Sequence, residues 1–149
     1  MTATLQYEIF RPAVMRQGRV LVVDDEISIR MPIRRSLLQA GLEVVEADDG
    51  HAAITALRAG DNALMVDAVL CDIRMPKIDG TDLIPYLRVK YPSIPIIVLT
   101  GYPDIDLAVR LMKVGVRDYL VKPASKQDLL QALMNAVDHH TIFKNQFVV

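Results

Sequence analysis

Leu21-Val22-Val23, followed at once by Asp24-Asp25, introduces a pattern in this chain: a short apolar run that stops at a polar residue. The pattern returns in Ala68-Val69-Leu70-Cys71 before Asp72, in Ile96-Ile97-Val98-Leu99 before Thr100, and in Tyr119-Leu120-Val121 before Lys122-Pro123. Short runs rich in Val, Ile and Leu are typical of parallel strands that are buried on both faces. The sequence therefore predicts an α/β fold.

Segments with helical spacing separate these runs. Ile29, Ile33 and Leu37 recur every four residues and share one face of a helix that ends at Gly41. Strands are predicted at about 19–24, 42–47, 66–72, 94–99 and 117–121, and further helices at about 50–59, 81–90 and 103–114 and from Ser125. Strict alternation favours a doubly wound five-stranded parallel sheet with helices on both faces. Pro32 and Pro85 are expected to kink or shorten their helices.

Length and composition limit the class of protein. The 149 residues suit one domain, and 52% hydrophobic residues are ample for a core. A net charge of −1 gives no sign of nucleic-acid binding, and one cysteine fits a reducing compartment. The sequence has neither an apolar run long enough for a membrane span nor the apolar stretch of a signal peptide. A cytoplasmic protein is expected.

The predicted domain occupies only part of the chain. We expect an N-terminal extension over 1–18, the domain over 19–137 and a C-terminal tail over 138–149. His139 and His140 in the tail are expected to be solvated residues near a helix end.

The polar residues that end the apolar runs are the candidate site. In parallel sheets the functional crevice lies outside the carboxyl ends of the strands, where these side chains would meet. Asp24, Asp25 and Asp72 are hard oxygen donors that suit Mg²⁺. Any one of them alone would more often be a turn residue or a helix cap, and it is the three together that indicate a metal site.

Asp72 is the candidate nucleophile, because a carboxylate can attack phosphorus and form an acyl phosphate. Lys122 can place a positive charge beside one phosphoryl oxygen, and Thr100 can donate its hydroxyl to another. Either residue alone has an ordinary structural explanation.

These residues carry a family resemblance. The chain resembles a response-regulator receiver domain over about Arg19 to Val137, in the motifs Val22-Val23-Asp24-Asp25-Glu26, Asp72-Ile73-Arg74-Met75-Pro76 with Asp79-Gly80, Leu99-Thr100-Gly101, and Gly115 to Pro123. The resemblance implies a flavodoxin-like (βα)5 fold with strand order 2-1-3-4-5. It implies transfer of a phosphoryl group to Asp72 from a histidine kinase or a histidine phosphotransfer protein. It also implies Mg²⁺ held by Asp24, Asp25, Asp72 and the backbone carbonyl of Arg74, and a cis peptide between Lys122 and Pro123.

The resemblance further implies a switch rather than an enzyme, with only self-phosphorylation from a donor and slow autodephosphorylation. Thr100 would move toward the phosphoryl group, and Tyr119 would turn inward behind it. The fourth helix, fifth strand and fifth helix would then present a changed surface to a downstream protein, an output domain or a second copy. Tyr119 also has a plain interpretation as a half-buried strand aromatic. The stretch from Thr100 to Lys113 resembles receivers of nitrogen-regulation transcriptional regulators.

Two other classes compete with this interpretation. A phosphatase of the haloacid-dehalogenase type uses a similar set on a similar sheet, but needs an Asp-x-Asp pair where this chain has Asp72-Ile73-Arg74. A degenerate receiver used only for docking would not need the complete set of five site residues. Arg74 and Tyr102 flank the expected phosphoryl site, and we hypothesise that they tune the lifetime of the acyl phosphate.

Overall fold

The computed structural model describes residues 18–147, so the first 17 residues of the predicted N-terminal extension lie outside the described residues. Five parallel strands form one sheet in the order β2-β1-β3-β4-β5. The strands are β1 (Arg19–Val23), β2 (Glu43–Ala47), β3 (Val66–Cys71), β4 (Ile96–Thr100) and β5 (Asp118–Val121). The predicted fold class and strand order are confirmed.

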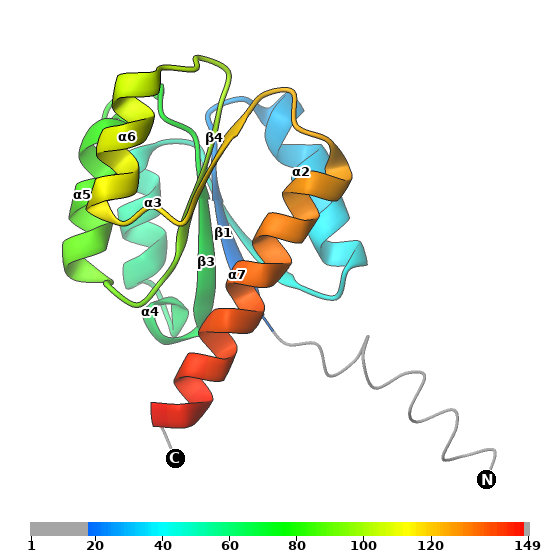
Figure 1. The fold of residues 1–149 in the computed structure, drawn as a ribbon. Coiled ribbons are helices and arrows are strands. Elements are labelled where there is room, and N and C mark those ends of the chain that lie inside the picture. Colours follow the sequence, from blue (N-terminus) through cyan, green and yellow to red (C-terminus); the bar gives the residue numbers. More distant parts are fainter. Residues whose placement is uncertain (1–17, 148–149) are drawn as a thin grey trace, which may run out of the picture.

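Helices cover both faces of the sheet (Figure 1). They are α2 (Ile27–Gln39), α3 (Gly50–Arg58), α4 (Asn62–Met65), α5 (Gly80–Lys90), α6 (Ile105–Val114) and α7 (Lys126–Phe147). α2 and α7 lie on one face, and α3, α5 and α6 lie on the other. Every strand and long helix lies within about two residues of its predicted position, apart from the end of α7.

The core has two parts, one on each face of the sheet. In β1, Leu21 and Val23 pack toward α3 and α5, whereas Val20 and Val22 pack toward α2 and α7. This two-sided burial explains why the strands are continuously apolar rather than alternating. Fully burying one such side chain stabilises the fold by about 1.5–3 kcal/mol. Because β1, β3 and β4 each contribute several, the sheet is a stable support for the residues at its ends.

Short polar side chains fix where the helices begin. Asp49, Asp79 and Asp104 cap α3, α5 and α6 by accepting backbone N–H groups of the first turn. Ser125 caps α7, since its Oγ accepts the N–H of Asp128 at 3.0 Å, as predicted. Pro103, predicted in the first turn of its helix, lies just before α6 instead.

Gly41 follows α2 with φ of +87°. The N–H of Leu42 bonds the carbonyl of Leu37 at 3.0 Å, which closes the helix end in a Schellman motif. Gly41 therefore ends the first helix as the sequence predicts.

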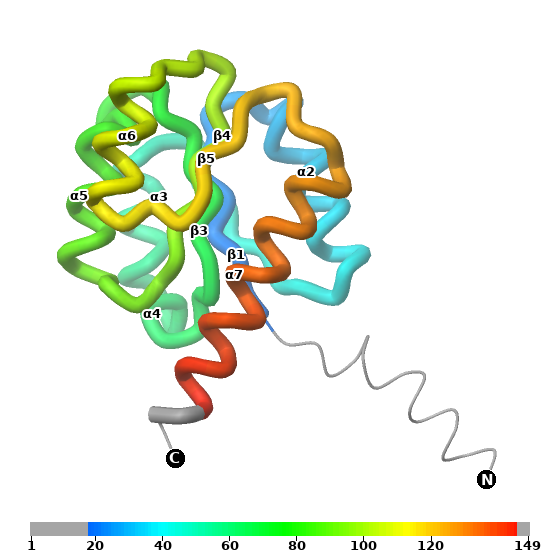
Figure 2. The backbone as a smooth tube through the Cα atoms, in the orientation of Figure 1, coloured from blue at the N-terminus to red at the C-terminus, as the bar shows by residue number. Residues whose placement is uncertain are grey.

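Three features depart from the sequence prediction. Pro32 and Pro85 lie inside α2 and α5, yet neither helix is shortened at its proline. The four-residue helix α4 before β3 was not predicted. α7 continues to Phe147, across the boundary predicted at Val137, and Figure 2 shows its last turns passing the base of the sheet.

Candidate functional site

Lys122 joins two buried carboxylates at the carboxyl ends of the strands. Its Nζ lies 3.0 Å from Asp24 Oδ2 and 3.1 Å from Asp72 Oδ2. Asp24 follows β1, Asp72 follows β3 and Lys122 follows β5, so the parallel sheet brings together residues that are far apart in sequence. This is the proximity that the apolar runs predict.

Asp25 and Glu26 extend this pair into an acidic cluster. Carboxylate oxygens of Asp24, Asp25, Glu26 and Asp72 all lie within 4.8 Å of one another. Such a set of hard oxygen donors fits Mg²⁺. Glu26 was not singled out as a site residue, although its position next to Asp24-Asp25 was the available signal. Its Oε1 also lies 3.9 Å from Lys122 Nζ.

Burial and charge act in opposite directions on the groups of the site. Burial raises the pKa of Asp72, the hydrogen bond from Lys122 lowers it, and the charge of Asp24 raises it, so the pKa stays above its ordinary value. For Lys122, burial lowers the pKa, but the hydrogen bonds to Asp24 and Asp72 outweigh burial and raise it. The ammonium is therefore firmly charged, and an added cation would favour the ionised form of Asp72.

The loop after β3 is packed tightly around Asp72. Asp72 Oδ1 accepts the backbone N–H of Ile73 at 2.7 Å. Gly80 N–H bonds the carbonyl of Ile73 at 2.7 Å, and a Cβ on Gly80 would lie 2.6 Å from the carbonyl oxygen of Asp72. Position 80 therefore has room only for glycine. Because Gly80 has no side chain, the Asp79-Gly80 turn can hold the loop close to Asp72, the phosphoacceptor candidate.

Arg74 and Tyr102 meet over the loops that border the site. The guanidinium carbon of Arg74 lies 4.2 Å from the centre of the Tyr102 ring, a cation–π contact. The sequence predicts both residues to flank the phosphoryl site but gives no sign that they touch. The backbone carbonyl of Arg74 remains a predicted metal ligand.

Thr100 and Tyr119 occupy adjacent strands beside the acidic cluster. Thr100 is fully buried at the end of β4, and its Oγ1 accepts the N–H of Tyr102 at 3.1 Å. The Tyr119 ring packs against the core beneath α6, and its hydroxyl is buried without a hydrogen-bond partner among the described residues. A buried hydroxyl without a hydrogen-bond partner carries a desolvation cost in this position.

Two further features lie at the ends of β3 and β5. The peptide bond between Lys122 and Pro123 is cis, as the resemblance implies. Cys71 precedes Asp72 and is fully buried, and this burial raises the pKa of its thiol. The thiol is therefore an inert packing group. No helix within residues 18–147 has the length and apolar character needed to cross a bilayer.

Comparison with known proteins assigns this arrangement to a family. Residues 20–134 match the model of the response regulator receiver domain. The chain is 34% identical over 126 residues to the DNA-binding transcriptional regulator NtrC of Proteus hauseri, covering 85% of this chain and 26% of that protein. It is 38% identical over 124 residues to the transcriptional regulatory protein ZraR of Klebsiella oxytoca, covering 83% and 27%. The chain thus spans about a quarter of the length of these relatives.

Solved structures give the same assignment. A response regulator receiver domain protein from Clostridium thermocellum superposes with a TM-score of 0.77 at 33% identity, over 85% of this chain and 98% of that one. The haloacid-dehalogenase alternative receives no support from any of these similarities. Receiver domains are signalling switches that work with histidine kinases and output domains, and this chain belongs to the response regulator receiver domain family.

Proposed function

We propose that Asp72 is the phosphoacceptor of this receiver domain and takes its phosphoryl group from a histidine kinase or a histidine phosphotransfer protein. The observation that carries the proposal is the position of Lys122, whose Nζ lies within 3.1 Å of both Asp24 and Asp72. A charged ammonium between two buried carboxylates is well suited to a group that gains negative phosphoryl oxygens during the reaction.

The transfer needs little covalent chemistry from the protein. A carboxylate oxygen of Asp72 forms a bond to phosphorus while the P–N bond of the donor phosphohistidine breaks, and the imidazole leaves with the electron pair. Lys122 offsets the negative charge that builds on the phosphoryl oxygens, and the Thr100 hydroxyl turns to donate to one of them. The product is an acyl phosphate that is lost slowly to water, as expected of a switch.

Asp24, Asp25, Asp72 and the carbonyl of Arg74 are the proposed ligands of Mg²⁺. The acidic cluster supports this assignment, because its oxygens lie close enough together to share one cation. When bound, Mg²⁺ supplies positive charge beside the transferring phosphoryl group. Glu26 stands at the edge of the same cluster and adds to its attraction for cations.

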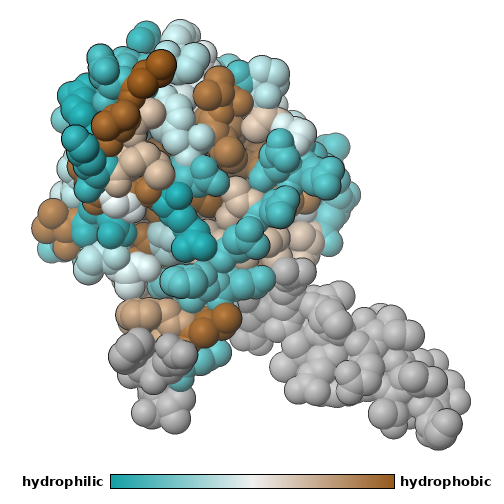
Figure 3. All heavy atoms as spheres, viewed as in Figure 1, coloured by the Kyte–Doolittle hydropathy of each residue, from teal (hydrophilic) through white to brown (hydrophobic). Residues whose placement is uncertain are grey.

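The proposed output is a change in the surface formed by α6, β5 and α7. An apolar groove of about 590 Å³ already lies on the α6 and β5 part of this surface, and Figure 3 shows apolar side chains gathered on this side of the molecule. Its apolar lining includes Pro103, Ile105, Val109, Met112, Tyr119 and Val121. Movement of Thr100 and Tyr119 would reshape this groove for an output domain or a second copy. Because the relatives are transcriptional regulators, we propose a transcriptional output.

Intact mass after incubation with acetyl phosphate and Mg²⁺ tests the phosphoacceptor. We expect one added phosphate on the unaltered chain and none on Asp72→Asn. Asp82→Asn, which alters an exposed carboxylate in the first turn of α5, is the matched control and should be modified normally. Absence of any added mass at saturating donor, or an equal gain on Asp72→Asn, would contradict the proposal.

Light scattering with and without acetyl phosphate tests the surface. If α6, β5 and α7 pair two copies, the phosphorylated chain should show a higher mass that Val109→Glu reverses, because a charge would lie in the apolar groove. A mass that does not respond to the phosphoryl donor would exclude pairing through this surface.

A further inference from the structure

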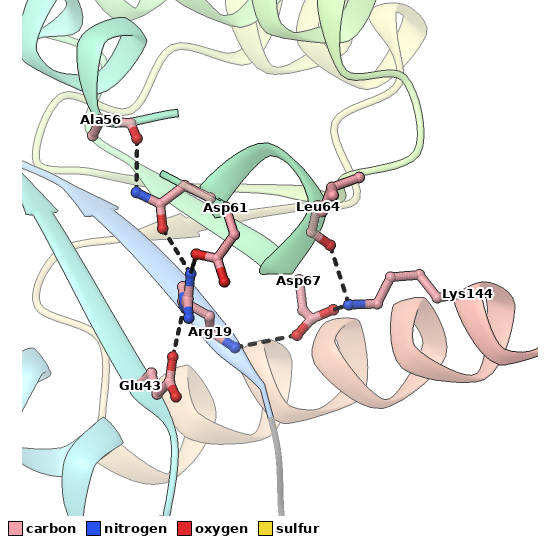
Figure 4. A network of polar contacts seen from close by, with 8 residues as sticks. Arg19, Glu43, Ala56, Asp61, Leu64, Asp67 and Lys144 are labelled. Atoms are coloured by element: carbon pink, nitrogen blue, oxygen red, sulfur yellow. Dashed lines mark hydrogen bonds and ion pairs between the residues drawn. The ribbon is translucent and has the colours of Figure 1, made fainter. Parts of the chain in front are cut away.

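A second buried charged group lies at the base of the sheet, at the end of β3 opposite the phosphoacceptor candidate. Asp67 is only 2% exposed. Its carboxylate accepts the backbone N–H of Arg19 at 3.2 Å and lies 2.8 Å from Nδ1 of His140 and 2.6 Å from Nζ of Lys144. Figure 4 shows Arg19 and Lys144 converging on this carboxylate. Nothing in the proposed phosphoryl chemistry uses these residues.

The partners on α7 belong to the part of that helix that lacks an apolar stripe. Up to Val137, α7 buries Leu129, Leu133, Ala136 and Val137 against the sheet. Of the described side chains from residue 138 to 145, only His140 is buried, while Ile142 and Phe143 are 58% and 43% exposed. The last turns of α7 therefore depend strongly on polar contacts with the body of the domain.

The helix α4 forms the other wall of this contact. Lys144 Nζ also lies 3.5 Å from the carbonyl oxygen of Leu64 in α4. Arg19 holds the start of α4 through Asp61 at 2.6 Å and Asn62 at 2.9 Å (Figure 4). The polar network thus joins β1, α4, β3 and the end of α7.

Electrostatics makes these contacts act together. A buried carboxylate that loses one charged donor retains its desolvation cost without full compensation. Removing the Lys144 ammonium should therefore cost more stability than breaking an ordinary surface ion pair, which contributes little. Both His140 and Lys144 therefore contribute to holding the end of α7 beside Asp67.

We propose that Asp67, His140 and Lys144 form a latch that holds the last turns of α7 against the base of the sheet. α7 has 22 residues, about 33 Å at about 1.5 Å per residue, whereas β3 is about 20 Å long. The latch makes the overhanging part of α7 rigid with the receiver domain. It thereby fixes the direction in which the chain leaves the domain.

Amide hydrogen exchange of the folded chain tests the latch. In Lys144→Met, which keeps the apolar stem and removes the charge, the amides of residues 138–147 should exchange about tenfold faster or more. Asp67→Asn should accelerate exchange over the same residues, and the double variant should add little to the larger single effect. The amides of β1, β3 and the first turns of α7 should keep their protection.

Lys126→Met is the matched control, since it removes an exposed lysine from the first turn of the same helix. It should leave exchange at residues 138–147 unchanged. Equal exchange there in Lys144→Met and the unaltered chain would overturn the latch, whether or not Asp67→Asn folds. Acetyl phosphate labelling of Lys144→Met should remain normal, so failure of the latch and failure of the phosphoacceptor proposal give different results.

Discussion

At the scale of single residues, Lys122 is the group on which the site depends most. It is the ammonium that separates Asp24 from Asp72, and each contact is about 3 Å long. Without it, two buried carboxylates would face each other across the crevice with only water or a metal ion to offset their charge.

Lys122→Met should therefore slow phosphoryl uptake from acetyl phosphate by about 10- to 100-fold, the loss expected for a hydrogen bond to a charged group. The rate of mass gain at fixed Mg²⁺ and donor measures this effect. Lys126→Met should react at the unaltered rate. Normal uptake by Lys122→Met would show that Lys122 has only a structural role.

Arg74 and Tyr102 are the second pair that matters at this scale. We propose that their cation–π contact shields the proposed phosphoryl site, so removing either side chain should let water reach the acyl phosphate more easily. We expect Arg74→Ala and Tyr102→Ala each to lose phosphate a few times faster, and the double variant to lose it no faster than the quicker single one. Dephosphorylation followed by intact mass checks this. Unchanged dephosphorylation rates in both single variants would show that Arg74 and Tyr102 do not protect the acyl phosphate.

At the scale of elements, a buried carboxylate lies at each end of β3. Asp72 lies at the end that meets the acidic cluster, and Asp67 lies at the end that meets α7. Burial alone raises the pKa of Asp67, but the hydrogen bonds from His140 and Lys144 outweigh it and leave the pKa below its ordinary value.

The lowered pKa of Asp67 gives a pH dependence with a definite sign. A carboxyl whose folded pKa lies below its unfolded one contributes stability at neutral pH, and this stability is lost as the pH falls through the folded pKa. Urea unfolding from pH 7 to below pH 4 should therefore show a loss of stability on acidification that is smaller in Asp67→Asn. If the free energy of unfolding fell equally with pH in the unaltered chain and in Asp67→Asn, the lowered pKa of Asp67 would be contradicted.

Some helix boundaries could be predicted from neighbouring residues, and others could not. Capping by Ser125 and closure by Gly41 follow from neighbouring residues and were predicted correctly. Pro32 was expected to kink or shorten its helix, and α2 is not shortened but continues through it, with Ile33 and Leu37 buried against the sheet. Tertiary packing offset the missing backbone hydrogen bond.

At the scale of the whole molecule, a cation bound at the acidic cluster should stabilise the folded domain. The proposed Mg²⁺ site exists only after β1 and β3 pair, so bound Mg²⁺ should raise the free energy of unfolding by about 2.7 kcal/mol at 100 times its dissociation constant. Thermal unfolding across a Mg²⁺ titration measures this. Asp25→Asn should shift the titration to higher Mg²⁺, and NaCl of equal ionic strength should not reproduce it. An unfolding temperature that does not change with Mg²⁺ concentration would exclude a cation site at the acidic cluster.

The pattern of residues predicts a parallel sheet and the set of polar residues at its strand ends, whereas the strand order β2-β1-β3-β4-β5 was implied by the family resemblance. The pattern can do so because buried parallel strands are continuous apolar runs, and because the residue that follows each run lies at the same edge of the sheet. Asp24, Asp72 and Lys122 come together for that reason alone.

Contacts away from that edge follow from how the helices and loops pack. The sequence suggested a solvated His140, but the structure buries it against Asp67, because α7 continues past its apolar stripe and crosses the base of β3. The contact of Arg74 with Tyr102 and the orphan hydroxyl of Tyr119 were equally hidden. These contacts join loops and helices whose relative positions depend on packing, and no local pattern of residues records them.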